Sequence, residues 1–223
     1  MTNQIRESIL NRLKNVPPSE LPQHPDLPPL SYLSMSNADL IEAFTRNITE
    51  QSAQVYRVRG PVELMETLGT VLNQDSLARI FLSEDELMNG FGVKSWAEQR
   101  GITVFKASDF KNKEEYKEAV FTVDASFTAI DFAVAESGTL IIRHNEKNAR
   151  LLSLAPLYHL ALVPADRLVA VYESVLERCR TDGALPSQLT FITGPSMTAD
   201  IQATPFRGMH GPRRLIVFLF DNA

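Results

Sequence analysis

The chain has 223 residues, with 22 Lys and Arg against 27 Asp and Glu, which gives a formal net charge of -5. At roughly 150 residues per domain, this length suits one large domain with an appendage. The contents of 44% hydrophobic and 22% charged residues are typical of a soluble globular protein and exclude a largely disordered chain. Because the net charge is negative, we expect no nucleic-acid partner.

Neither a membrane span nor a cofactor is expected on this chain. The longest purely apolar run near the C-terminus, 215–220, is far shorter than the roughly 20 residues of a spanning helix. No apolar stretch follows the first charged residues, so we expect no secretory signal and a cytoplasmic location. Cys179 is the single cysteine, which excludes an intramolecular disulfide, a multi-cysteine zinc site and a four-cysteine iron–sulfur cluster. We expect Cys179 to pack in the core.

The N-terminal segment differs in pattern from the rest of the chain. Its first fourteen residues carry apolar side chains at helical spacing, which predicts a short amphipathic helix with one docking face. These side chains are Ile5, Ile9, Leu10 and Leu13. Six prolines between positions 17 and 29 favour an extended arm, which we interpret as a strap on its own domain, with partner binding as the alternative. We therefore divide the chain into 1–30, a helix and a proline-rich arm, and 31–223, an α/β domain.

The pattern after the arm alternates between helices and strands. Ser36 is placed to cap a helix over 37–52, and Pro61 to open a second helix up to about residue 73. Short apolar runs predict buried strands. These runs are 54–58, 78–82, 102–105, 121–124, 140–143, 159–163, 189–193 and 215–220. Continuous apolar runs are typical of parallel strands that are buried on both faces. The sequence thus predicts an α/β fold of three layers, with a largely parallel central sheet covered by helices.

Two segments place small and polar residues beside predicted strands. Residues 135–140 read Ala-Glu-Ser-Gly-Thr-Leu, and residues 193–201 read Thr-Gly-Pro-Ser-Met-Thr-Ala-Asp-Ile. Ligands of open α/β sheets bind beyond the carboxyl ends of the strands, so we expect ligand-binding residues in both segments. The candidates are Ser137, Gly138, Thr139, Gly194, Pro195, Ser196, Thr198 and Asp200. Helix capping is the alternative role for the hydroxyl and carboxylate side chains of the second segment.

A third segment, 207–214, reads Arg-Gly-Met-His-Gly-Pro-Arg-Arg and leads into the last predicted strand. Three guanidinium groups and one imidazole can form a cationic pocket wall, with His210 and Gly211 as candidate contacts to a carboxylate or a phosphate. A turn with solvated arginines is the alternative. The other histidines of the domain, His144 and His159, stand in or beside strands and are interpreted as structural. No set of metal ligands emerges, and Walker, Gly-x-Gly-x-x-Gly, His-Glu-x-x-His and Gly-x-Ser-x-Gly motifs are all missing from the sequence.

Taken together, the three segments resemble the lactate utilization protein C family and its LUD domain. The motifs that carry the resemblance are Ala-Glu-Ser-Gly-Thr-Leu, Gly-Pro-Ser-x-Thr-Ala-Asp-Ile and Gly-x-His-Gly-Pro, in this order. The resemblance spans about residues 30 to 223. Two positions depart from the family pattern: Gln202 stands where the family usually has an acidic residue, and Met209 where it has a small aliphatic one.

The resemblance implies a fold similar to the ribose-5-phosphate isomerase and CoA-transferase superfamily. It also implies participation in bacterial oxidation of L-lactate to pyruvate, alongside iron–sulfur partner proteins. Our leading interpretation is a non-redox subunit of that system, which binds the small carboxylate or helps assembly. The alternative is an autonomous acyl- or CoA-transferase, because Glu136-Ser137-Gly138 is similar to the Glu-x-Gly segment whose Glu is the nucleophile in CoA transferases. In the first interpretation Glu136 caps or pairs near a strand. A pure interaction module is a third hypothesis.

Overall fold

The protein is described by a computed structural model that covers residues 2–15, 35–145, 148–181, 186, 188–199 and 205–221. The chain divides into two compact units, Met1–Ser31 and Tyr32–Ala223. In the first unit, helix α1 (Thr2–Lys14) forms as predicted. The predicted proline-rich arm over 17–29 lies outside the described residues.

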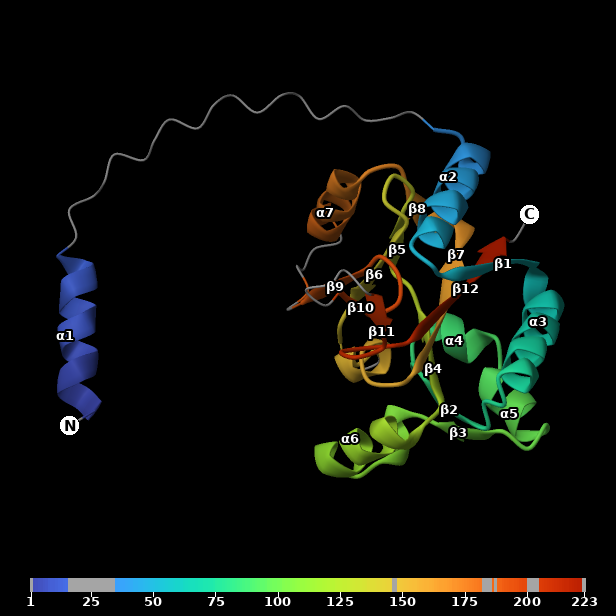
Figure 1. The fold of residues 1–223 in the computed structure, drawn as a ribbon, viewed down its shortest axis with the longest axis horizontal. Coiled ribbons are helices and arrows are strands. Elements are labelled where there is room, and N and C mark those ends of the chain that lie inside the picture. Colours follow the sequence, from blue (N-terminus) through green and yellow to red (C-terminus); the bar gives the residue numbers. More distant parts are fainter. Residues whose placement is uncertain are drawn as a thin grey trace. The chain divides into compact units, whose positions relative to one another are not determined.

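A six-stranded sheet, parallel throughout, forms the centre of the second unit (Figure 1). Its strand order is β1-β12-β7-β4-β2-β3. The strands are β1 (Gln54–Arg59), β2 (Arg79–Leu82), β3 (Thr103–Phe105), β4 (Ala125–Ala129), β7 (Tyr158–Pro164) and β12 (Arg214–Asp221). Alternate residues of β12 enter different cores, Phe218 on one face and Val217 on the other. Because both faces of the strand are buried, its run of apolar residues is continuous, and the predicted α/β fold with a largely parallel sheet is confirmed.

Helices cover the sheet, and three of them begin at a side-chain cap, provided by Ser36, Asp85 and Asn112. They are α2 (Asn37–Glu50), α3 (Gly60–Gln74), α4 (Glu86–Gly90), α5 (Val93–Glu98), α6 (Lys113–Thr122) and α7 (Tyr172–Thr181). The Asp39 backbone N–H donates to Ser36 Oγ, and the Ser36 N–H donates to the Asp39 carboxylate, so a capping box starts α2. Pro61 lies in the first turn of α3. Apolar side chains of α3, α4 and α5 form one core with the sheet.

A second, four-stranded sheet packs with α2 on the opposite face of the central sheet. Its order is β8-β5-β6-β9, and its strands are β5 (Phe132–Val134), β6 (Thr139–Arg143), β8 (Leu168–Val169) and β9 (Leu189–Ile192). Helix α7 packs on its outer side, where Cys179 is fully buried as predicted. Strands β10 (Met197–Ala199) and β11 (Pro205–Arg207) form a separate antiparallel pair. No helix among the described residues is long and apolar enough to cross a membrane.

One predicted strand does not form, and a second forms outside the parallel sheet. The run 121–124 is not a strand, because α6 continues through Thr122 and leaves Phe121 61% exposed. The next strand, β4, starts only after Asp124, whose carboxylate accepts hydrogen bonds from the backbone N–H groups of Ala78 and Arg79. The run 189–193 forms β9, but this strand pairs antiparallel with β6 and does not join the parallel sheet.

Candidate functional site

The two glycines of the first and second segments lie against the C-terminal end of α2. Gly138 has φ +64°, and a Cβ at this position would lie 2.3 Å from the Ile48 backbone nitrogen. Gly194 has φ +127°, and a Cβ there would lie 2.6 Å from the Gln51 carbonyl oxygen. Only glycine combines these backbone angles with such close backbone contact. The two segments are therefore held to the same helix end by close packing.

Polar contacts reinforce this junction. Asn47 Nδ2 of α2 donates to the carbonyl oxygens of Ala135 at 2.7 Å and Glu136 at 2.9 Å. A chain of hydroxyl groups then joins the segments, with 2.8 Å between Ser137 Oγ and Thr139 Oγ1 and 2.8 Å from Thr139 Oγ1 to Thr193 Oγ1. The hydroxyls of the first segment thus bind each other and the end of β9.

Ser196 connects the second segment to the third through its backbone. Its N–H donates to the Pro212 carbonyl at 2.8 Å, and its carbonyl accepts from the Gly208 N–H at 2.9 Å. Gly211 is also close, because a Cβ there would lie 3.2 Å from Ser196 Cβ. Ser196 does not cap a helix, since strand β10 follows it directly. Thr198 is an exposed residue of that strand, so helix capping is wrong for both hydroxyls.

We call the three joined segments, 135–140, 193–198 and 207–214, the motif cluster. The cluster lies beside the start of β1, at Gln54, and the start of β12, at Arg214. The expectation that it lies beyond the carboxyl ends of parallel strands is therefore wrong. The reason is that β9 runs antiparallel to β6, and that the third segment precedes its strand instead of following it.

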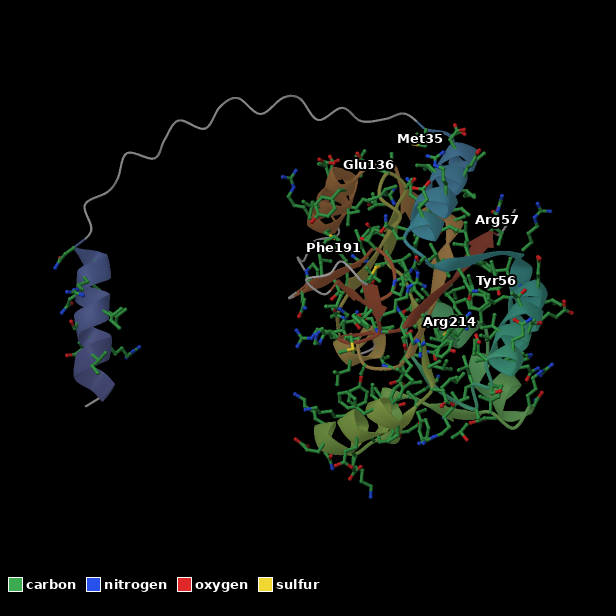
Figure 2. All side chains as sticks on the ribbon, in the orientation of Figure 1. Met35, Tyr56, Arg57, Glu136, Phe191 and Arg214 are labelled. Carbon is green, nitrogen blue, oxygen red and sulfur yellow. The ribbon has the colours of Figure 1, made fainter. Side chains whose placement is uncertain are left out.

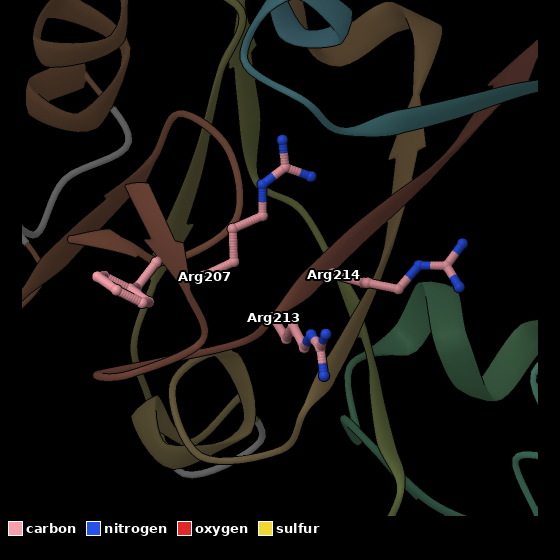
Figure 3. A pocket seen from close by; sticks show the side chains of 4 residues that line it. Arg207, Arg213 and Arg214 are labelled. Atoms are coloured by element: carbon pink, nitrogen blue, oxygen red, sulfur yellow. The ribbon is translucent and has the colours of Figure 1, made fainter. Parts of the chain in front are cut away.

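The third segment forms one wall of a cavity of about 620 Å³, which we call the arginine cavity (Figure 3). Its lining residues are Phe206, Arg207, Arg213 and Arg214. Two of the guanidinium groups are held by the protein: Arg214 by Asp75, at 2.5 Å, and Arg207 by Ser52 Oγ, at 3.0 Å. Among the described residues the Arg213 side chain has no hydrogen-bond or ion-pair partner. The predicted cationic wall thus contains one guanidinium that is available to an anion.

Glu136, Pro195 and His210 are not among the residues that line this cavity. Figure 2 shows Glu136 well separated from Arg214. The Glu136 side chain is exposed, and no described residue pairs with its carboxylate, so the structure offers no partner for the predicted capping or pairing role. His210 is exposed as well, while Pro195 is buried. Asp200 lies outside the described residues.

The two histidines interpreted as structural are both hydrogen-bonded. His159 is fully buried, with Nε2 2.8 Å from Thr128 Oγ1, and desolvation by burial lowers its pKa to about 4. His144 has ring nitrogens 3.1 Å from the Asn148 carbonyl and 2.7 Å from Thr190 Oγ1. Desolvation also lowers the pKa of His144. In the described parts of the chain, no three His, Cys, Asp or Glu side chains are grouped to hold a metal ion.

Sequence reasoning missed a second polar cavity, of about 360 Å³. Its lining residues are Asp85, Glu86, Leu87, Ala129, Asp131, Arg143, Asn145, Asn148 and Arg167. They come from segments that are far apart in the sequence, so no local motif marks them. The signal that could have found it is the pair of aspartates that closely follow β2 and β4, Asp85 and Asp131. We call it the switch-point cavity.

The fold and the motif cluster together define an α/β protein with a parallel sheet and a glycine-packed junction at the amino-terminal edge of that sheet. The chain belongs to the LUD domain family, which matches residues 41–220. Its relatives include Lactate utilization protein C 1 of Bacillus mycoides, with 31% identity over 71% of this chain and 70% of the relative. Lactate utilization protein C of Halalkalibacterium halodurans is 27% identical over 84% of this chain and 81% of the relative.

A solved structure has the same fold. The crystal structure of a DUF162 family protein from Deinococcus radiodurans matches with a TM-score of 0.61 and 24% identity. The match covers 83% of this chain and 99% of that protein.

Proposed function

We propose that this chain is a non-redox subunit in bacterial L-lactate utilization, the oxidation of L-lactate to pyruvate. The observation that carries the proposal is membership of the LUD domain family together with extensive similarity to proteins named Lactate utilization protein C. The electron-transfer step belongs to iron–sulfur partner proteins in this proposal. One buried cysteine suits that division of labour.

The arginine cavity is the proposed site for the small carboxylate. A guanidinium can donate two parallel hydrogen bonds to one carboxylate, and Arg213 has its guanidinium available. Arg207 and Arg214 add positive charge to the lining, and Phe206 supplies an apolar surface for a methyl group. The Arg213 backbone is fixed, because its N–H donates to the Leu157 carbonyl at 2.8 Å. The cavity therefore holds a carboxylate by charge and leaves its substituent against an aromatic ring.

Deletion of the gene in the bacterium that carries it tests the role. We expect growth on L-lactate as the carbon source to fail while growth on glucose continues. Wild-type protein and Arg178→Gln, an exposed arginine on α7 that does not line the cavity, restore growth on L-lactate. Arg213→Gln does not restore it. Normal growth of the deletion strain on L-lactate would contradict the proposal.

Binding measurements on purified protein test the arginine cavity separately from the role in lactate utilization. Titration with L-lactate should show at least tenfold weaker binding to Arg213→Gln than to Arg178→Gln, with equal melting temperatures. Equal affinities would show that the arginine cavity is not the lactate site. The role in lactate utilization would then be tested by the growth experiment alone.

The alternative of an autonomous acyl- or CoA-transferase rests on Glu136. The geometry does not favour it, because Glu136 lines neither the arginine cavity nor the switch-point cavity. Its carboxylate also has no described neighbour that would orient it, whereas a nucleophile needs a positioned and activated environment.

A further inference from the structure

The switch-point cavity lies where the central sheet changes winding direction. From β2 the chain moves outward to β3, the edge strand, and then returns to the other side of β2 as β4. From β4 it continues through β7 to β12 in the opposite direction. In open α/β sheets the crevice beyond the carboxyl ends of the two strands at such a point is the usual place for a ligand. Asp85 follows β2 and Asp131 follows β4, and both line this cavity.

An unpaired buried oxygen marks the cavity independently of the topology. Asn148 lines it and is only 4% exposed. Among the described residues, no donor forms a hydrogen bond with its Oδ1 atom. The amide orientation is fixed, because Nδ2 donates to the Ala129 carbonyl at 3.1 Å and a carbonyl can only accept. A buried acceptor without a donor is costly, so this oxygen is suited to receive a hydrogen bond from a bound molecule.

The remaining side chains supply both charge signs. Arg143 Nε lies 3.1 Å from Asp131 Oδ1, and the Arg143 backbone N–H donates to Asp131 Oδ2 at 2.7 Å. Arg167 Nη1 donates to the Ile130 carbonyl at 2.6 Å, which fixes the guanidinium and leaves other N–H groups of that fork for a ligand. Asp85 accepts from Ser83 Oγ and the Met88 N–H, and a carboxylate has further acceptor positions.

We propose that the switch-point cavity binds a hydroxylated anion, a sugar acid or sugar phosphate. The anionic group contacts Arg167, and hydroxyl groups donate to Asn148 Oδ1 and to the aspartates. The volume of about 360 Å³ falls in the range of pockets that hold small organic ligands. The proposal does not depend on the role in lactate utilization, since the cavity and the arginine cavity share no residue.

Amide chemical shifts of the full chain test the proposal, with gluconate and glycerol 3-phosphate as probes. Propionate and inorganic phosphate are the matched anions without hydroxyl groups. We expect at least one hydroxylated probe to shift the amides of Ala129, Asn148 and Arg167, with an affinity at least tenfold higher than its matched anion. A preference for gluconate identifies a sugar acid as the ligand class, and a preference for glycerol 3-phosphate identifies a sugar phosphate.

Two variants check the contacts. Arg167→Gln should weaken binding of the preferred probe at least tenfold, and Asn148→Ala should weaken it too, if that variant folds. Arg213→Gln, in the arginine cavity, should weaken binding of L-lactate and leave binding of the preferred probe unchanged. Three outcomes would overturn the proposal and indicate that the cavity holds only water. They are equal binding of anions with and without hydroxyls, shifts confined to the arginine cavity, and no shifts with either probe.

Discussion

The two ends of the strands in the central sheet differ: residues at the amino-terminal edge pack closely, whereas residues at the carboxyl-terminal edge surround a cavity. At the amino-terminal edge, segments rich in small residues are packed together, and a Cβ on Gly138 or Gly194 would collide with the backbone at the C-terminal end of α2. At the carboxyl-terminal edge, a cavity remains between loops, and it contains a buried amide oxygen of Asn148 that has no partner in the described chain. A motif that is visible in a sequence can therefore mark a packing junction, while the switch-point cavity is assembled from residues that form no motif.

Gly138→Ala should have the largest effect on stability. A positive φ costs an L-residue roughly 1–2 kcal/mol, and overpacking adds about 1–3 kcal/mol, so we expect a loss of about 2–5 kcal/mol in the free energy of unfolding, measured with denaturant. Gly60→Ala is the matched control, because Gly60 has φ +78° but nothing within 4 Å of its Cβ position. It should cost only about 1–2 kcal/mol. Equal losses would show that contact with α2 contributes nothing.

Lowering the pH should destabilise the folded protein, because it protonates the buried His159. His159 has a pKa of about 4 when folded, below its ordinary 6.5, so the unfolded chain binds this proton more readily. The stability from keeping His159 neutral is complete above pH 6.5 and is lost as the pH falls to about 4, by roughly 3 kcal/mol. Denaturant unfolding of wild type and His159→Gln at several pH values measures this loss. A stability difference between them that stays constant from pH 7 to 4 would contradict the assignment.

Glu136→Gln should have the smallest effect. The carboxylate is exposed and has no described partner, so we expect a change within about 0.5 kcal/mol and an unchanged L-lactate titration. Denaturant unfolding and calorimetry measure the two quantities. CoA transfer by the isolated chain that disappears in Glu136→Gln would instead support the acyltransferase alternative.

Local sequence determined much of the fold. The capping box of Ser36 and Asp39 starts α2 at the predicted residue, because its hydrogen bonds are made within four residues. The apolar run 215–220 forms a strand buried on both faces, since burial of every side chain requires an apolar residue at every position. The burial of Cys179 followed in the same way from the spacing of its own helix.

Only the tertiary structure decided which partners each segment has. The run 189–193 has the pattern of a strand in either sheet, and its antiparallel pairing with β6 depends on a segment about fifty positions earlier. The same holds for Gly138, which must be a glycine because a Cβ there would collide with the backbone of Ile48. The buried Oδ1 atom of Asn148 has no partner among the described residues, while Nδ2 of the same amide is bonded to the Ala129 carbonyl, and no neighbour in sequence reveals this. Hydrogen bonds within one turn can be read from the chain, whereas contacts between distant segments exist only once the sheet has ordered them.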